Sequence, residues 1–390
     1  MSSRGCALSI ARRCYIQRML RGVVPATLQI GSTPAAAVLH AIRVGAPVTR
    51  DRLADITGLS PATINRQVTA LAGLGLITER PDLVSPGSIG RPKNPLTLDR
   101  DALCAAGMHI GARRTLLTIV DMGGRPLYSH AVLTPQGDAD AALDELCGQL
   151  RELADRFSGR RLLWGGAAIG GSVDAVSGHV DHPILGWRRA PLGTVLADAL
   201  AVPVSVCEHV EAMAAAELLL GQTIVDAASG LFFYARETTG MAMTLNGRVH
   251  IPVRGAGSIA HIRVDAPVLC PGPGATLSDV IGSEATLRAA HRLRVAPDAS
   301  PIVDERARIL GEVVATFRDA LNPDSVVVAG DAFAAHPHGL APVQAAFDAA
   351  SKVGWPLELT PSLFGVTVPE GAAIVVALSV IYADPVASLT

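Results

Sequence analysis

The sequence has few cysteines, and none of them form closely spaced pairs. Its 390 residues include six cysteines, with no Cys-x-x-Cys spacing anywhere along the chain. A disulfide framework or a zinc knuckle requires paired thiols, so this distribution predicts reduced thiols and neither kind of stabilised fold. The six are Cys6, Cys14, Cys104, Cys147, Cys207 and Cys270.

Long apolar runs are also lacking. The N-terminal segment has no unbroken apolar stretch of signal-sequence length, and we expect no later segment long and apolar enough to span a bilayer. These absences predict a cytoplasmic protein without membrane contact. Residues 1–32 are expected to form a basic, disordered tail, with a DNA-contacting arm or an overextended start as the alternatives. The tail's arginines are Arg4, Arg12, Arg13, Arg18 and Arg21.

Acidic residues are scarce in the first part of the chain. Residues 1–100 contain 13 Arg or Lys but only 5 Asp or Glu, whereas residues 101–390 contain 20 and 30. The overall charge of -2 therefore hides a basic segment joined to an acidic one. The length suggests two or three domains, and a basic domain is suited to contact with phosphate groups.

The basic part contains a helix-turn-helix pattern from Thr49 to Arg80. Gly58 can end a first helix in the left-handed conformation, and Ser60 followed by Pro61 is typical of an N-cap and first helical residue. A further helix is expected before these two, over residues 34–43. The residues expected to face inward are Val38, Leu39 and Ile42 in this helix, Leu53, Ala54 and Ile56 in the next, and Ile64, Val68 and Leu71 in the last.

The outward face of the second helix has side chains suited to DNA. Asn65 can pair with adenine and Arg66 with guanine, and Thr69 lies on the same face. Ser60 or Thr63, near the start of the helix, can hold a phosphate. The alternative is an ordinary helical hairpin with a solvated face.

A wing is expected to follow this helix, over residues 76–98. Its tip contains Gly90-Arg91-Pro92 with Lys93 beside it, which is narrow enough to place an arginine in a minor groove. A Pro/Gly linker between domains is the alternative. Residues 33–98 are thus predicted to form a winged helix-turn-helix domain that binds an operator in double-stranded DNA.

After Asp99 the chain becomes rich in short β segments and glycine turns, beginning with a hairpin near residues 107–120 and a turn over residues 121–125. Taken with the first domain, the chain resembles the ROK family, which groups sugar-responsive repressors with sugar kinases. The resemblance rests on LSPATINRQVTALAGLGLITER with GRP, GMHIGARRT, AIGGSVDAVSGHV, ILGWRRAPL, PVSVCEHVEAMAAAE, GMAMTLNGRVH, GAGSIAHIRV and VVVAGD, in this order.

The resemblance implies an α/β fold. An N-terminal winged helix-turn-helix would precede a two-lobed actin-like ATPase (ribonuclease H-like) domain over residues 99–390, with a sugar cleft between the lobes. It also implies a homodimer or homotetramer, and the winged domain places the chain on the repressor branch.

Several positions depart from the family's kinase pattern. Kinases have Asp-x-Gly-Gly-Thr where this chain has His109-Ile110-Gly111-Ala112-Arg113, and the turn Glu237-Thr238-Thr239-Gly240 and the pair Gly330-Asp331 are also poor in glycine. Crowded loops hinder the approach of backbone amides to phosphate. The family's catalytic Asp lies within Glu-Asn-Asp-Ala-Asn, where this chain has Cys207-Glu208-His209-Val210-Glu211; His209 takes the place of the Asp, or the Asp is deleted, so neither catalysis nor a nucleotide cofactor is expected.

The sugar ligands of the family are altered as well, since Ile184 and Ser258 replace an Asn and a Glu. An unmodified hexose is therefore a weaker candidate than another polar, sugar-like effector. Its ligands would be Asp174, Glu208, His209, Glu211 and His261, unless the pocket is vestigial. The family's zinc needs three cysteines beside the histidine, and Cys270 is alone, so no metal is predicted.

These features predict a transcriptional regulator with a degenerate kinase-like domain for dimerisation and ligand sensing. The resemblance implies that the regulator is a repressor. The alternative function is a carbohydrate kinase that phosphorylates a hexose or amino sugar with ATP.

Overall fold

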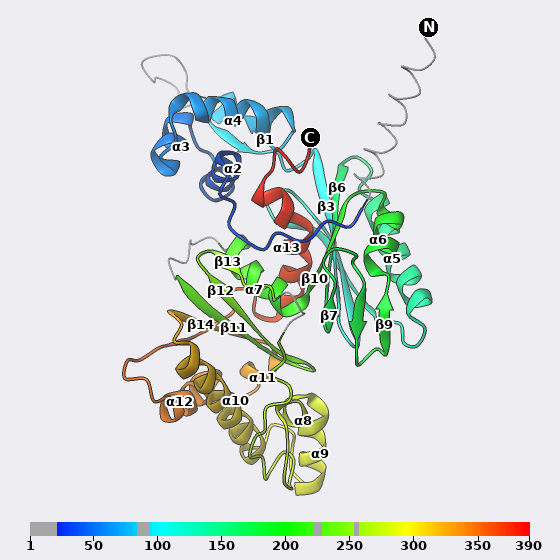
Figure 1. Ribbon diagram of the computed structural model, residues 1–390, viewed down its shortest axis with the longest axis vertical. Coiled ribbons are helices and arrows are strands. Elements are labelled where there is room, and N and C mark those ends of the chain that lie inside the picture. Colours follow the sequence, from blue (N-terminus) through cyan, green and yellow to red (C-terminus); the bar gives the residue numbers. More distant parts are fainter. Residues whose placement is uncertain (1–21, 84–93, 222–227, 253–256) are drawn as a thin grey trace. The chain divides into compact units, whose positions relative to one another are not determined.

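The structure is a computed structural model that describes residues 22–83, 94–221, 228–252 and 257–390. The chain divides into two compact units (Figure 1). Unit 1 comprises Met1–Glu208 with Ala373–Thr390, and unit 2 comprises His209–Ala372. Each unit is described by itself below.

Among the described residues of unit 1, three short helices and a pair of strands come before the main sheet. The helices are α2 (Pro34–Gly45), α3 (Arg50–Thr57) and α4 (Pro61–Gly73), and the strands β1 (Ile77–Glu79) and β2 (Leu96–Leu98) pair antiparallel around the 3-10 turn η1 (Pro81–Leu83). Each helix starts where a hydroxyl side chain can accept a backbone N–H: Thr33 from Ala36, Thr49 from Arg52 and Ser60 from Thr63. The predicted helices are confirmed by these bounds.

One detail of the predicted helix packing is wrong. Leu53 is the buried residue of α3, whereas Ile56 is 50% exposed. The two positions differ by about 60° around a helix, because each residue turns the chain by about 100°. Ala54 and Thr57 are partly buried on the other side of Leu53, so the covered stripe of this helix does not include Ile56.

The rest of unit 1 is built on a five-stranded sheet in the order β10-β6-β3-β4-β5. The strands are β3 (Leu103–Ile110), β4 (Arg114–Val120), β5 (Pro126–Leu133), β6 (Arg161–Ile169) and β10 (Val204–Glu208), and β10, β6 and β3 are parallel. The hairpin expected after residue 107 is confirmed as β3–β4. A small sheet of β7 (Ser172–Val173), β8 (Val180–His182) and β9 (Trp187–Ala190) follows β6.

Helices cover both faces of this sheet. On one face, α5 (Ala139–Asp155) and α6 (Leu192–Leu200) share an apolar core with the sheet. On the other, α13 (Val368–Ala383) passes so close that a Cβ added to Gly107 would lie 2.6 Å from the carbonyl oxygen of Ala373, and one added to Gly166 would lie 2.3 Å from the amide nitrogen of Ala377. Because Gly107 of β3 and Gly166 of β6 have no side chain, α13 can pack directly against the backbone of these two neighbouring strands.

The same helix corrects the expectation that no segment is apolar enough to span a bilayer. Residues Gly365–Ala383 are long and apolar enough by length and composition, but 61% of the tested window is buried inside the protein. Burial against a sheet explains this composition, since a helix that is apolar all round suits a protein core as well as a membrane. The expectation about length and composition is therefore wrong for this one segment, and its burial accounts for it without a membrane.

Part of the expected N-terminal tail has a defined structure. Residues 1–21 lie outside the described residues, but Val23 forms a parallel β-bridge with Val204 of β10, and Leu28 is 2% exposed. The predicted disordered tail over residues 1–32 therefore extends too far. These contacts join residues more than a hundred positions apart, which a local sequence pattern does not reveal.

Unit 2 contains a second five-stranded sheet, in the order β13-β12-β11-β14-β15. The strands are β11 (Ser229–Ala235), β12 (Thr239–Leu245), β13 (Arg248–Val249), β14 (Ser325–Ala329) and β15 (Leu359–Pro361). The helices are α7 (His209–Leu220), α8 (Leu277–Ile281), α9 (Ser283–Leu293), α10 (Ser300–Leu321), α11 (Asp331–Ala334) and α12 (Ala341–Ala350), with the 3-10 turn η2 (Gly365–Thr367).

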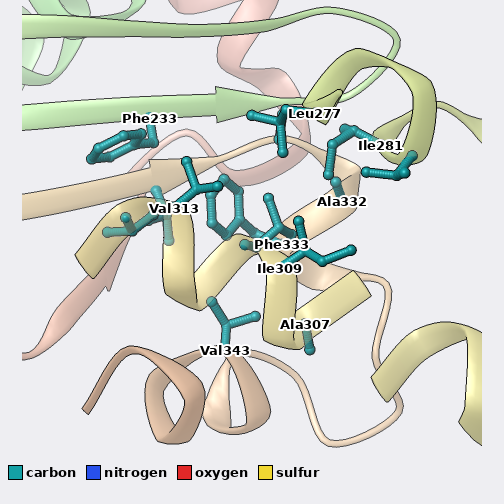
Figure 2. Close-up of a cluster of buried hydrophobic side chains, with 14 of the residues drawn as sticks. Phe233, Leu277, Ile281, Ala307, Ile309, Val313, Ala332, Phe333 and Val343 are labelled. Atoms are coloured by element: carbon teal, nitrogen blue, oxygen red, sulfur yellow. The ribbon is translucent and has the colours of Figure 1, made fainter. Parts of the chain in front are cut away.

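The core of unit 2 lies between this sheet and its helices. Figure 2 shows Phe233 of β11 and Phe333 of α11 beside Ile309 and Val313 of α10, and Val343 of α12 approaches α10 from its other side. Close packing of α12 on α10 depends on Gly311, where an added Cβ would lie 2.6 Å from the carbonyl oxygen of Val343. Both units are thus α/β structures with a core of their own.

Candidate nucleic-acid interface and ligand site

The outward face of α4 carries the side chains predicted to contact DNA. Asn65, Arg66 and Thr69 are exposed, while Ile64, Val68 and Leu71 are buried at 0%, 1% and 0% exposure. The buried stripe fixes the rotation of the helix about its axis, because a different rotation would expose it to water. The Thr69 hydroxyl donates to the Asn65 backbone carbonyl at 2.9 Å, so its proton is used within α4.

Ser60 and Thr63 have a structural role at the start of α4. The Ser60 Oγ accepts the Thr63 backbone N–H at 3.2 Å and lies 3.0 Å from the Thr63 hydroxyl. Gly58, with a φ of 67°, ends α3 in the left-handed conformation, as expected. The sharp turn and the cap together set the direction in which α4 leaves its neighbour. A phosphate contact by Ser60 or Thr63 remains a prediction.

The base of the β1–β2 pair is tied to the start of α3. Arg50 donates to one carboxylate oxygen of Glu79 at 2.6 Å, and the Asn94 amide donates to the other at 2.9 Å. These bonds hold the pKa of Glu79 below its usual value, and the bond from Asn94 has the larger effect. Glu79 is thereby paired rather than presented to a polyanion. Arg91 and Lys93 lie outside the described residues.

Three of the predicted ligand residues are buried, one at the end of β10 in unit 1 and two at the start of α7 in unit 2. Glu208 ends β10 at 8% exposure, and His209 and Glu211 stand in the first turn of α7 at 7% and 6%. The imidazole of His209 meets the ring of Tyr234 edge to face, with 5.6 Å between the ring centres. Ionisable groups are costly to bury without partners, so such a group of them marks a functional or tightly bonded position.

Asp174 and His261 are placed differently. The Asp174 carboxylate closes the turn after β7, accepting the backbone N–H groups of Val176 and Ser177 at 3.0 and 3.2 Å. These hydrogen bonds lower the pKa of Asp174, those from Ser177 more than the one from Val176. His261 is exposed in the segment between β13 and α8. In unit 1 the short strand β7, which leads into the Asp174 turn, lies against β10, which leads into Glu208.

Comparisons with known proteins show the family of the chain. Residues 105–351 match the model of the ROK family. The chain belongs to the ROK family. It is 43% identical over its whole length to the transcriptional regulator Rv0485 of Mycobacterium tuberculosis, of which it covers 95%. It is 23% identical over 328 residues to the DNA-binding transcriptional dual regulator NagC of Escherichia coli, covering 76% of this chain and 80% of NagC.

Solved structures of ROK proteins share the fold. The structure of a ROK family transcriptional regulator, a homologue of the E. coli MLC protein, matches with a TM-score of 0.73 at 20% identity and covers 91% of this chain and 98% of that one. The ROK hexokinase of Thermus thermophilus matches with a TM-score of 0.58 at 24% identity, covering 71% of this chain and 99% of that one. The ROK part of the chain is therefore an α/β, sugar-kinase-like fold of the actin type.

The first loop that departs from the ROK kinase pattern is closed by its own backbone. After His109 and Ile110 end β3, the Gly111 N–H donates to the Arg114 carbonyl at 3.1 Å. The Gly111 carbonyl accepts the Thr134 hydroxyl at 2.7 Å, and the Ala112 carbonyl accepts the Gln136 amide at 3.2 Å. An amide used within the turn is not available to a phosphate group.

At the second departure, which lies in unit 2, the structure shows an ion pair that was not predicted. The Nε of Arg236 lies 2.9 Å from a carboxylate oxygen of Asp331, joining the β11–β12 turn to the start of α11. Beside it, the Ser283 hydroxyl donates to Glu237 at 2.8 Å. These two segments hold the second glycine-poor turn and the Gly330-Asp331 pair. The sequence showed the missing glycines but did not show that Arg236 bonds to Asp331, because the two are far apart in the chain.

Proposed function

We propose that this ROK protein is a DNA-binding transcriptional regulator, and specifically a repressor. Residues 33–98 act as a winged helix-turn-helix domain in which α4 enters the major groove. The observation that carries the proposal is the exposed Asn65, Arg66 and Thr69 face on a helix whose rotation is fixed by a buried stripe. The names of its relatives Rv0485 and NagC support it.

Within this proposal, each residue of the interface has its own task. Asn65 and Arg66 read base edges, Thr69 contacts the same groove, and Ser60 and Thr63 lie where a phosphate meets the start of α4. Arg91 and Lys93 of the wing contact the neighbouring minor groove. The protein binds as a homodimer or homotetramer, so its operator contains two related half-sites separated by whole helical turns.

Residues 99–390 serve dimerisation and ligand sensing rather than catalysis. A polar, sugar-like effector is held through Glu208, His209 and Glu211, with Asp174 and His261 as further ligands. A ligand shifts DNA affinity only by its different affinity for the DNA-bound and free arrangements of the protein. The closed loop at Gly111 and the Arg236–Asp331 ion pair argue against a nucleotide cofactor and against kinase activity. A protein with this function works in the cytoplasm.

Selection from genomic DNA tests the proposal. The full-length chain is incubated with sheared genomic fragments at modest salt, and retained fragments are sequenced and remeasured individually by fluorescence anisotropy. The proposal expects a small set of fragments that share a two-fold related motif and bind at least a thousandfold more tightly than random duplex, on the order typical of specific recognition. Retention of random and genomic DNA alike would contradict it.

A further inference from the structure

An irregular segment precedes helix α2 and runs along unit 1. We call residues 22–32 the strap; Figure 1 shows it in dark blue, passing α13 on its way to α2. At its first end the carbonyl of Gly22 accepts the Val204 N–H at 3.1 Å, and the Val24 N–H donates to the Val204 carbonyl at 2.8 Å. The strap therefore adds a short parallel bridge to β10, which is the edge strand of its sheet.

The side chain of Val23 fits between two glycines. A Cβ added to Gly178 would lie 3.2 Å from one Val23 methyl, and a Cβ added to Gly193 would lie 2.6 Å from the other. The two glycines are joined to each other, since the Gly193 N–H donates to the Gly178 carbonyl at 3.0 Å. Gly178 also donates to the Asp174 carbonyl at 2.7 Å, so Val23 touches the turn that Asp174 begins.

The other end of the strap is wedged between α2 and the end of α13. A Cβ added to Gly31 would lie 2.5 Å from the Ala36 Cβ of α2, and 2.7 and 2.8 Å from the carbonyl oxygens of Tyr382 and Ala383. The contact continues through Arg43, whose guanidinium lies 5.3 Å from the centre of the Tyr382 ring. No side chain larger than hydrogen fits at Gly31 without a shift of backbone.

Two features make the strap more than a covalent tether. Its first end touches both segments that lead to candidate ligand residues, the Asp174 turn and the strand that ends at Glu208. Its second end touches α2 and helps to hold it against α13. The strap is also held between its ends, since Leu28 is 2% exposed and the Gln29 N–H donates to the Thr27 carbonyl at 2.9 Å, so a movement of either end acts on packed residues along the strap rather than on a loose loop.

We propose that the strap couples the Asp174 turn and β10 to helix α2, so that ligand binding at the first changes the position of the DNA-binding helices at the second. The proposal rests on the proposed function for its biological meaning, but the coupling itself is a property of the free protein. Coupling between two sites is reciprocal, and a disturbance at either end must therefore be felt at the other.

Hydrogen–deuterium exchange on the full-length chain without any ligand measures this directly. Val23→Ala empties the slot between Gly178 and Gly193, and Gly31→Val forces the strap away from α2 and α13. We expect Val23→Ala to speed exchange of the α2 amides about fivefold or more, the scale set by the loss of two packed methyl groups. Gly31→Val should speed exchange at Gly178 and Val204 to a similar extent.

Matched controls keep the test specific. Val176→Ala changes the same turn at a position that is 76% exposed, and Gly45→Ala changes α2 where an added Cβ meets nothing within 4 Å. Neither control should alter exchange at the far end of the strap. Gly31→Ala replaces Gly31→Val if exchange of β3 and β6 shows that the larger substitution has unfolded unit 1.

A result in which each strap variant speeds exchange only at its own end would overturn the proposal and leave the strap a passive tether. Because the measurement uses neither DNA nor an effector, its outcome is independent of the selection experiment. Failure to retain genomic DNA with intact coupling would remove the proposed function, and specific DNA binding without coupling would remove this inference alone.

Discussion

Arg236 and Asp331 form an ion pair at 2.9 Å that joins the β11–β12 turn to the start of α11. ROK kinases resemble this chain in fold, and these two segments are where it departs from the glycine-rich pattern of those kinases. The pair is half-exposed, so its contribution to stability is small, but it joins the two segments directly through their side chains.

We therefore expect ATP with magnesium to leave the thermal unfolding midpoint of the wild-type chain unchanged. A ligand present at about a hundred times its Kd stabilises a protein by about 2.7 kcal/mol, which is readily seen as a shift of several degrees. Differential scanning fluorimetry across a series of ATP concentrations checks this. A saturable, magnesium-dependent rise would show that the two segments accept a nucleotide after all.

The N-cap of α4 gives a prediction about stability. Ser60→Ala removes the acceptor for the Thr63 N–H and should lower the stability of the unit formed by α2, α3 and α4 by about 1 kcal/mol. Amide exchange of α4 in the full-length chain measures the loss. Ser60→Asp is the matched control, because its carboxylate can accept the same N–H, and an equal loss in both variants would mean that the cap is not the cause.

The glycines under α13 give a prediction about packing. Gly166→Ala should destabilise unit 1 by about 1 to 3 kcal/mol, because the new Cβ would meet the backbone of Ala377 rather than a flexible side chain. Urea unfolding followed by amide exchange of β6 measures the cost. The control is Gly148→Ala in α5, where an added Cβ meets nothing within 4 Å and alanine favours the helix. Equal destabilisation by the two variants would mean that α13 does not approach the sheet so closely.

Glu217 gives a prediction about pH. Burial raises the pKa of its carboxyl, an effect partly offset by hydrogen bonds from the Ser362 hydroxyl and the Leu363 N–H. The folded protein therefore binds this proton more tightly than the unfolded chain, and the stability that protonation provides is lost as pH rises through the folded pKa.

Glu217→Gln keeps one acceptor for Leu363 and one amide for Ser362 without the charge. We expect it to be more favourable relative to wild type at pH 7 than at pH 4, as measured by thermal unfolding at both values. A difference between the two proteins that does not change with pH would contradict the assigned cause. Glu152→Gln at an exposed position of α5 is a control for the effect of removing one carboxylate elsewhere.

The start and direction of α4 were predictable because their signals are local. Gly58, Ser60 and Pro61 are three of four consecutive residues, and each has a strong preference for its position at a helix end. The burial of Ile64, Val68 and Leu71 followed from helical spacing. Ile56 was misplaced because periodicity does not say how wide the covered stripe of a short helix is.

The remaining features depend on contacts between distant parts of the chain. The pairing of Val23 with Val204 and the ion pair of Arg236 with Asp331 join segments with no common sequence signal. For the candidate ligand site, the sequence pointed to Glu208, His209 and Glu211, each of which is buried in the structure. It did not show that the Asp174 carboxylate is engaged by its own turn.

The central claim is that α4 reads DNA through its exposed face, and Arg66→Ala tests it most directly. With a selected genomic fragment in fluorescence anisotropy, we expect the variant to lose about 1 to 3 kcal/mol of binding free energy, or roughly 5- to 150-fold in affinity, and to discriminate less against altered half-sites. Arg151→Ala, an exposed arginine of α5, should bind as wild type does. Unchanged affinity in Arg66→Ala, or an equal loss on every sequence tested, would contradict the account.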